Sequence, residues 1–380
     1  MLALRGMDQL RQTVSQCIEL DRSLLVQLRE EIRPLKGTTR RIHPRTTTSI
    51  SLVATDGGNN QLRFDPFLIQ LVRVVDSSHN EYCLEAVSPT TPIDELTRRQ
   101  FDESGRPRTA LGRMMEYLGV STLSDLSHMI RPTKPGAPVS PGWVQVYRQL
   151  VEWSVVFSLL EMDFATDTLI VLDGLLRSKV FARDLFRKLI KGMEARIQVQ
   201  YDKKRRRIYL VGIAKRSKVL ERYRLAMALE GVLQTGYPAY TPVPRDIEER
   251  AYVWSEYARG EDREVKGREI NKFVGGKMFL VKFGPRPRDP VWPVDIFTPQ
   301  ADQAPVILGS LLADALNGFP VPYYPMCLQK AHESAALVDF DLEILQDLIF
   351  EGIRETLGDE VPALDVFRLQ DGNPSQRRYG

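Results

Sequence analysis

The stretches T-L-I-V-L-D-G (168–174) and S-L-V-A-T-D-G-G (51–58) decide the fold, because both run from apolar residues into an aspartate followed by glycine. A short apolar run of this kind predicts a strand that is buried on both faces of a sheet. The glycine after each aspartate permits a sharp turn and the close approach of a ligand. If the two strands are neighbours, the side chains of Asp56 and Asp173 converge on one place at the edge of the sheet.

The segments around these two strands predict the topology. Two further strand patterns, 67–75 and 82–87, follow the first strand, and a long helix is predicted over residues 143–162. After strand 168–172 we expect helix 179–193, strand 207–214, and helices 218–232, 305–317, 328–338 and 341–357. Three early strands followed by alternating helices and strands predict an α/β fold. Its form is a ribonuclease H-like mixed sheet flanked by helices, in which an antiparallel meander is extended by parallel strands.

The chain has 380 residues, which is more than one core usually fills, and the extra length falls in identifiable places. Two insertions are predicted at about 89–142 and 235–300, where proline and glycine interrupt the patterns. The predicted parts are an N-terminal helix and basic linker (1–48, with the helix at 2–33), the main domain (49–338), and an acidic C-terminal helix and tail (339–380).

The composition excludes several classes of protein. With 43% hydrophobic and 27% charged residues, the chain is neither disordered nor of low complexity. No run approaches the roughly 18 apolar residues of a membrane span. Arg5, Asp8 and Arg11 stand where a signal peptide needs its apolar stretch. The three cysteines are far apart and form neither a disulfide framework nor a zinc spacing. We therefore expect a cytoplasmic protein with no membrane segment.

The net charge of +3 hides an uneven distribution. Residues 179–224 contain sixteen basic and four acidic residues, a net charge of +12, whereas residues 339–360 contain eight acidic residues and one arginine. A dense basic run is typical of a surface that binds a phosphate backbone, although a solvated hairpin tip would explain it equally well. Tyr201, Tyr209 and Tyr223 would supply base stacking beside it. The candidate nucleic-acid-binding residues are Lys203, Lys204, Arg205, Arg206, Arg207 and Arg216.

The two aspartates predict a metal site. Paired carboxylates repel each other unless they are protonated or bridged by a cation, and hard oxygen ligands suit Mg²⁺ or Mn²⁺. Asp-Gly is also a common turn dipeptide, but two such strand ends in one chain favour the site. Glu152 is the last polar residue on its stripe of helix 143–162 before the stripe becomes apolar. On its own, a solvated helix face explains this position better, whereas the functional interpretation places the glutamate where the helix crosses the sheet, facing the two aspartates.

Two further residues join this group of candidates. His332 is a candidate metal ligand or proton shuttle if its helix docks on the carboxylates, although a lone helix histidine is more often structural. Lys215 follows strand 207–214 and is a candidate to bind the scissile phosphate or orient the attacking water. It is equally explained as part of the general basic segment.

Several motifs are absent from the sequence. There is no G-x-x-x-x-G-K-[S/T], no G-x-G-x-x-G, no G-x-S-x-G and no H-E-x-x-H. An ATP-driven activity would therefore have to come from a partner.

At the residues named above, the sequence resembles the NurA family, nucleases of archaeal and bacterial DNA end processing. The D-G-L-L and A-H-E pieces are the most specific, and the two predicted insertions match poorly. The matching pieces are S-L-V-A-T-D-G-G (51–58), L-V-E-W (150–153), T-L-I-V-L-D-G-L-L (168–176), V-G-I-A-K-R-S (211–217) and F-P-V-P-Y-Y-P-M-C-L-Q-K-A-H-E (319–333).

The resemblance implies a ribonuclease H-like nuclease domain, a homodimer, and Mn²⁺- or Mg²⁺-dependent 5′→3′ exonuclease and single-strand endonuclease activity on DNA. It also implies a HerA-type hexameric ATPase as the partner in DNA end processing or defence. Asp56 and Asp173 match the family's catalytic aspartates, Glu152 its helix glutamate and His332 its late histidine. These four residues are the expected metal ligands, and Lys215 is expected to assist them.

Two other interpretations remain open at this point. One is an actin-like ATP-binding fold, which is also built on ribonuclease H-like units but needs a late glycine-rich adenosine loop that we do not find. The other is a catalytically inactive DNA-binding or translocase-docking subunit. The presence of all four candidate ligands counts against it.

Overall fold

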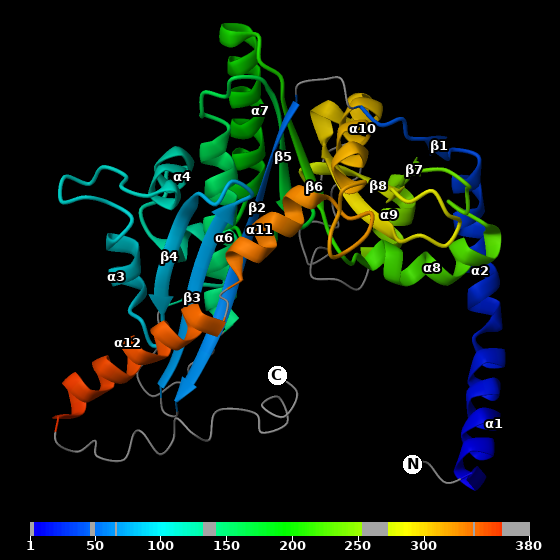
Figure 1. Ribbon diagram of the computed structural model, residues 1–380, viewed down its shortest axis with the longest axis horizontal. Coiled ribbons are helices and arrows are strands. Elements are labelled where there is room, and N and C mark those ends of the chain that lie inside the picture. The colour runs from blue at the N-terminus through cyan, green and yellow to red at the C-terminus, as the bar shows by residue number, and fades with distance from the viewer. Residues whose placement is uncertain are drawn as a thin grey trace.

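The computed structural model describes residues 4–45, 50–64, 67–131, 142–252, 273–336 and 339–358, and a nine-stranded sheet lies at its centre (Figure 1). The strands are β1 (Arg40–Arg41), β2 (Ile50–Phe64), β3 (Phe67–Asp76), β4 (Glu81–Val87), β5 (Asp167–Asp173), β6 (Ile208–Ile213), β7 (Ala239–Pro242), β8 (Gly276–Lys282) and β9 (Val291–Phe297). Their order across the sheet is β1-β7-β8-β9-β6-β5-β2-β3-β4.

Five of these strands form the ribonuclease H-like core. Strands β2, β3 and β4 make an antiparallel meander, β5 lies parallel to β2, and β6 lies parallel to β5. The registers place Thr55 opposite Leu172, and Asp173 opposite Ile213. The predicted fold class, an antiparallel meander extended by parallel strands, is therefore confirmed.

Strand β2 is longer than the sequence predicted. We expected it to end at Asp56, but it continues to Phe64, because its hairpin with β3 keeps pairing as far as Phe64 and Phe67. Its pairing with β5 ends at Thr55. Asp56 is therefore the first residue of β2 beyond its parallel neighbour, and that neighbour itself ends at Asp173. The two aspartates share one edge, although only one of them ends a strand.

Helices cover both faces of the sheet (Figure 1). They are α1 (Leu4–Leu20), α2 (Arg22–Ile32), α3 (Ile93–Arg98), α4 (Ala110–Leu118), α5 (Leu123–Leu126), α6 (Gly142–Leu159), α7 (Leu185–Lys204), α8 (Lys218–Glu230), α9 (Arg245–Tyr252), α10 (Ala304–Ala315), α11 (Met326–Ala335) and α12 (Asp339–Leu357). Along β5, Ile170 and Leu172 join the apolar core under α6 and α7, whereas Leu169 and Val171 join the core under α10 and α11. This alternation is the period of two expected of a strand, and it makes β5 apolar throughout.

Two helix predictions need correction. The single helix expected over 2–33 is divided at Asp21 into α1 and α2, and α1 extends away from the sheet (Figure 1). The helix expected over 179–193 begins at Leu185 and continues to Lys204. The basic run is therefore the end of a helix and the turn into β6, not a hairpin tip.

The two segments predicted as insertions are built differently. Residues 93–131 contain the short helices α3, α4 and α5, whose apolar side chains share one core with α6. Strands β7, β8 and β9 enlarge the same sheet, with β9 antiparallel to β6.

A third core joins α2 and α8 through residues such as Ile32 and Tyr223. None of the described helices has the length and apolar character needed to cross a membrane.

Candidate active site

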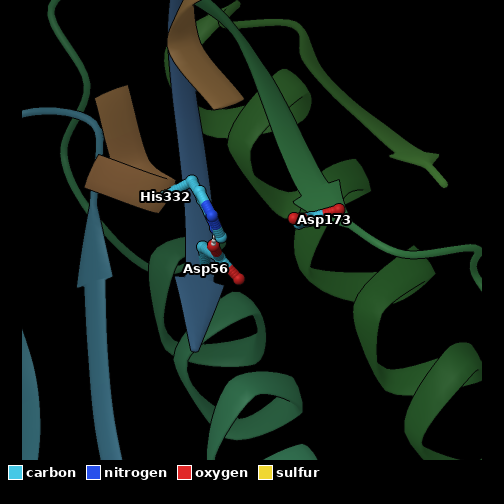
Figure 2. A group of neighbouring side chains, drawn as sticks. All are labelled: Asp56, Asp173 and His332. Atoms are coloured by element: carbon cyan, nitrogen blue, oxygen red, sulfur yellow. Dashed lines mark hydrogen bonds and ion pairs between the residues drawn. The ribbon is translucent and has the colours of Figure 1, made fainter. Parts of the chain in front are cut away.

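Asp56, Asp173 and His332 come together at the edge of the sheet (Figure 2). Each residue offers one ligand atom, and these three atoms lie within 4.8 Å of one another. His332 Nδ1 is 2.7 Å from Asp56 Oδ2. The histidine is exposed while the two aspartates are half-buried, so the group opens to solvent on the side of α11. The structure thus brings together three residues that were selected from distant parts of the sequence.

Two glycines after Asp56 let helices from opposite faces reach β2. A Cβ atom on Gly57 would lie 2.0 Å from Glu152 Oε1 of α6, and one on Gly58 would lie 2.3 Å from the carbonyl oxygen of Ala335 in α11. Successive residues of a strand face opposite sides, so α6 approaches one face here and α11 the other. The D-G-G sequence is therefore needed for the packing of both helices around the aspartate.

Glu152 approaches the site from the α6 face and is not one of the three closely spaced ligands. Burial raises the pKa of Glu152 to about 8; Arg148 opposes this shift, and the charges of Asp56 and Asp173 add to it. Arg148 Nε lies 3.3 Å from Glu152 Oε1, and Arg148 Nη1 donates to the carbonyl of Gly57 at 2.7 Å. The role of Arg148 was missed from the sequence, although it lies one helical turn before the glutamate, where side chains of one face meet.

Asp173 has two neighbours that shape its environment. Its pKa is raised by burial and by the charge of Asp56, and it is lowered in part by Lys215. Lys215 Nζ lies 3.5 Å from Asp173 Oδ2 and 5.8 Å from the ring centre of Tyr324. Burial, together with the charges of Asp173 and Asp56, raises the pKa of the Tyr324 phenol, so it stays protonated. Tyr324 was missed from the sequence, because nothing in the piece F-P-V-P-Y-Y-P marks this tyrosine as chemically important.

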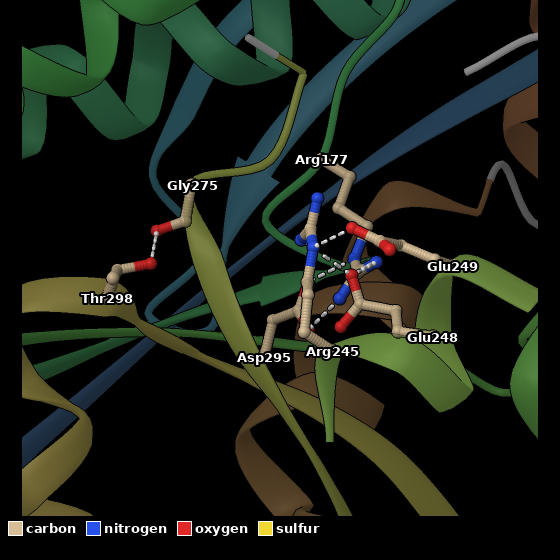
Figure 3. Close-up of polar contacts among 7 residues, drawn as sticks. All are labelled: Arg177, Arg245, Glu248, Glu249, Gly275, Asp295 and Thr298. Atoms are coloured by element: carbon tan, nitrogen blue, oxygen red, sulfur yellow. Dashed lines mark hydrogen bonds and ion pairs between the residues drawn. The ribbon is translucent and has the colours of Figure 1, made fainter. Parts of the chain in front are cut away.

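A buried ion cluster anchors the turn after Asp173 (Figure 3). Arg177 Nε and Nη2 donate to the two carboxylate oxygens of Asp295 at 2.7 and 2.8 Å, and Nη1 donates to Glu248 Oε1 at 2.7 Å. Buried charges need such pairing to offset the loss of hydration. Arg177 also forms a backbone bridge with Val274. The segment that leaves β5 is thereby held against β9 and α9.

The basic residues predicted to bind nucleic acid lie at opposite ends of β6. Lys215 and Arg216 follow its carboxyl end beside the aspartates, and both are exposed. Residues 203–207 precede its amino end. The extended chain from Arg207 to Ile213 spans about 20 Å at about 3.3 Å per residue. The densest basic run therefore does not contact the carboxylates.

The three tyrosines considered for base stacking differ in their exposure to solvent. Tyr201 is exposed, whereas Tyr209 and Tyr223 are buried in the apolar cores. The prediction that these two buried tyrosines stack on bases is therefore wrong, because strand β6 and helix α8 turn them inward.

The donor atoms fit a divalent cation. Two carboxylates suit Mn²⁺ or Mg²⁺, and an imidazole beside them is more typical of transition metals, so the mixed set favours Mn²⁺ of the two. The raised pKa values of Asp173 and Glu152 show that negative charge is unfavourable here without a cation. A bound divalent ion would relieve that repulsion.

The strand order and the clustered side chains define the class: a ribonuclease H-like α/β protein with a carboxylate–histidine group at its sheet edge. Among solved structures, the chain is similar to the NurA nuclease from Sulfolobus solfataricus, at 12% identity and a TM-score of 0.45, over 94% of this chain and 99% of that one. It is also similar to NurA with manganese, at 14% identity and a TM-score of 0.36, over 92% of this chain and 100% of that one.

A third structure, NurA bound to dAMP and manganese, is similar at 12% identity and a TM-score of 0.36, over 89% of this chain and 94% of that one. No protein-family model matches the chain, and no curated protein sequence matches it. The resemblance to NurA that the sequence pieces predict is thus found among solved structures as well.

Proposed function

We propose that this chain is a metal-dependent deoxyribonuclease that hydrolyses phosphodiester bonds. One observation carries the proposal: ligand atoms of Asp56, Asp173 and His332 lie within 4.8 Å of one another at an accessible sheet edge. Burial and the charge of Asp56 raise the pKa of Asp173, so the negative charge of Asp173 is unfavourable without a cation. Perturbed carboxylates in such a group are typical of functional sites, and a cation held there would attract a phosphate.

Asp56, Asp173 and His332 would hold Mn²⁺ or Mg²⁺, with Glu152 supporting them from the other face of the sheet. When bound, such an ion stabilises the negative charge that develops on the phosphoryl group. The contact between His332 Nδ1 and Asp56 orients the ring, which leaves Nε2 as the nitrogen that would bind the ion.

The remaining side chains would bind and orient the strand. Lys215 is half-exposed beside Asp173, so its ammonium can donate charge-assisted hydrogen bonds to a non-bridging phosphate oxygen. The protonated phenol of Tyr324 can donate to Asp173 or to the substrate. Arg148 holds Glu152 and the backbone of Gly57, which keeps both carboxylate-bearing elements in place.

We further infer from the matching sequence pieces that the activity is 5′→3′ exonucleolytic and single-strand endonucleolytic, on single-stranded DNA or duplex ends. The same pieces support a homodimer and a HerA-type hexameric ATPase partner in DNA end processing or defence. The absence of a P-loop from the sequence is consistent with energy supplied by that partner.

The proposal is tested by incubating the full chain with end-labelled single-stranded DNA in Mn²⁺, in Mg²⁺ and in chelator. We expect cleavage with metal, faster in Mn²⁺, and none in chelator. Cleavage that persists in chelator would contradict the metal site. DNA binding without cleavage in either metal would instead support the inactive-subunit interpretation.

A further inference from the structure

We propose that the carboxyl end of α7 is a second DNA site, which holds an unpaired strand. The site lies about 20 Å from the carboxylates, which is the length of β6 at about 3.3 Å per residue. The identity of the ligand as DNA rests on the proposed function. The site itself rests on a cavity, a group of unpaired cations and a strained arginine, all at the same helix end.

The cavity lies between the last turns of α7 and the start of β6 and has a volume of about 450 Å³. This is within the roughly 300–1,000 Å³ of typical ligand sites. Its walls combine an aromatic ring, side-chain amides, a guanidinium and one carboxylate; the residues that matter here are Glu194, Gln198, Tyr201, Arg207, Gln300 and Gln303. A second hollow, also about 450 Å³, lies on the other side of the helix and includes Lys203 and Lys204. The basic helix end is thus flanked by two concave surfaces.

This helix end carries more positive side chains than are required to offset the helix dipole. Positive side chains near a helix carboxyl end offset a dipole equal to roughly half a charge. Five consecutive cations, residues 203–207, stand here. Lys204 pairs with Asp163 at 2.9 Å, but the other four form no ion pair with any described residue. Their charge is available to a polyanion.

Arg205 occupies a backbone position that favours glycine. Its φ of +54° is left-handed and caps α7, where glycine or asparagine is usual. An arginine held in this conformation costs stability, and such strain is tolerated where a side chain serves a function. Its guanidinium lies 5.5 Å from the ring centre of exposed Tyr201. A cation therefore stands beside an accessible aromatic face, the pair of groups that binds a phosphate backbone and a stacked base.

These features favour an unpaired strand over other polyanions. The bases of a duplex are stacked inside it, so they cannot enter a cavity beside Tyr201. An acidic protein segment would use the cations but would gain little from the aromatic ring. A single strand uses both, because every base has a face that stacks on an aromatic side chain.

The test measures binding of a fluorescent oligo-dT to the full chain by anisotropy in chelator, where no metal-dependent cleavage interferes. A variant with Lys203, Arg205, Arg206 and Arg207 each changed to Gln should show a salt slope about three units shallower, at about 0.7 per single-strand phosphate contact. A matched variant with Arg98, Arg106, Arg108 and Arg113, all exposed on the first insertion, changed to Gln should keep the slope. An unchanged slope in the first variant, or an equal loss in the second, would overturn the site.

Two single variants separate binding from helix stability. Tyr201→Leu should weaken oligo-dT binding by about 5- to 150-fold, the range expected for loss of one stacked base. Arg205→Gly should also weaken binding while its thermal midpoint stays equal or rises, because glycine relieves the left-handed strain. A fall in thermal midpoint without loss of binding would make Arg205 structural and remove it from the site.

Competition with poly-glutamate identifies the ligand class. Displacement of oligo-dT that depends on the cations but not on Tyr201 would favour an acidic protein and overturn the DNA assignment. Because binding is measured without metal, loss of the nuclease proposal would leave this result standing, and loss of this site would leave cleavage at the carboxylates untouched. A small phosphodiester that reaches only the carboxylates should be cleaved equally by all these variants.

Discussion

Two groups of carboxylates lie beside the turn that follows β5, and they differ in how far neighbouring cations balance their charge. Around Arg177, Asp295 and Glu248 accept hydrogen bonds of 2.7–2.8 Å from one guanidinium that is itself buried (Figure 3). Arg245 also pairs with Glu248, at 3.2 Å, so the first group has two cations for its two carboxylates. In the second group, three carboxyl groups (Asp56, Asp173 and Glu152) have two cations beside them among the described residues: Lys215, 3.5 Å from Asp173, and Arg148, 3.3 Å from Glu152.

The difference indicates that the first group stabilises the fold and that the second group is available to bind a ligand. Although burial opposes it, Asp295 and Glu248 raise the pKa of Arg177, so the guanidinium stays charged. Burial and neighbouring carboxylates raise the pKa of Glu152 to about 8, which means that its charge is unfavourable. A fold gains nothing from a buried carboxyl group whose charged form it disfavours, so the presence of Glu152 points to a ligand that completes the site.

The largest expected effect concerns cleavage. Asp56→Ala and Asp173→Ala should each lower the cleavage rate of labelled single-stranded DNA by about 10,000-fold, or about 5 kcal/mol, because each removes a ligand of the proposed ion. DNA binding should persist, since the basic residues are retained. Asp94→Ala, at an exposed carboxylate of α3, is the matched control and should cleave normally. Full activity in either site variant would remove that aspartate from the mechanism.

The fold core was predictable because its signals are local. The apolar runs 168–172 and 67–75 and the alternation of strands and helices predict the meander and the parallel strands. The length of β2 was not predictable, because Asp56-Gly57-Gly58 resembles a turn until the hairpin with β3 carries the strand through it. Gly57 and Gly58 allow two helices to pack against β2, and no local sequence pattern predicts that packing.

The site was predictable only in part for a similar reason. Asp56 and Asp173 carry a strand-end signal, and the matching pieces select His332. Arg148 and Tyr324 have no signal of their own, since their importance comes from which carboxylate the folded chain places beside them. The buried Arg177 cluster was likewise invisible, because its three members are separated by about 70 and 120 positions.

The next largest effect concerns stability at the neutralised group. Arg177→Met should lower the free energy of unfolding by about 3–5 kcal/mol, because it leaves the buried carboxylate of Asp295 without its cation and Glu248 with Arg245 alone. Arg99→Met, which breaks an exposed pair with Glu95, is the matched control and should cost less than about 1 kcal/mol. Urea denaturation measures both. Equal small costs would show that the Arg177 cluster does not carry the stability assigned to it.

The smallest effect has the opposite sign and depends on pH. Without metal, the folded chain keeps a proton on Glu152 up to about pH 8, whereas the unfolded chain releases it near the usual value of 4.5. Stability contributed by this proton is present below pH 4.5 and is lost as the pH rises towards 8. In chelator, Glu152→Gln should match the wild-type protein near pH 4.5 and exceed its stability above pH 8 by on the order of 1–3 kcal/mol. Glu161→Gln, at an exposed glutamate just after α6, should keep the wild-type pH dependence. Parallel stability curves for Glu152→Gln and the wild type across this range would mean that the fold does not disfavour the charge of Glu152, and the contrast with the Arg177 cluster would fail.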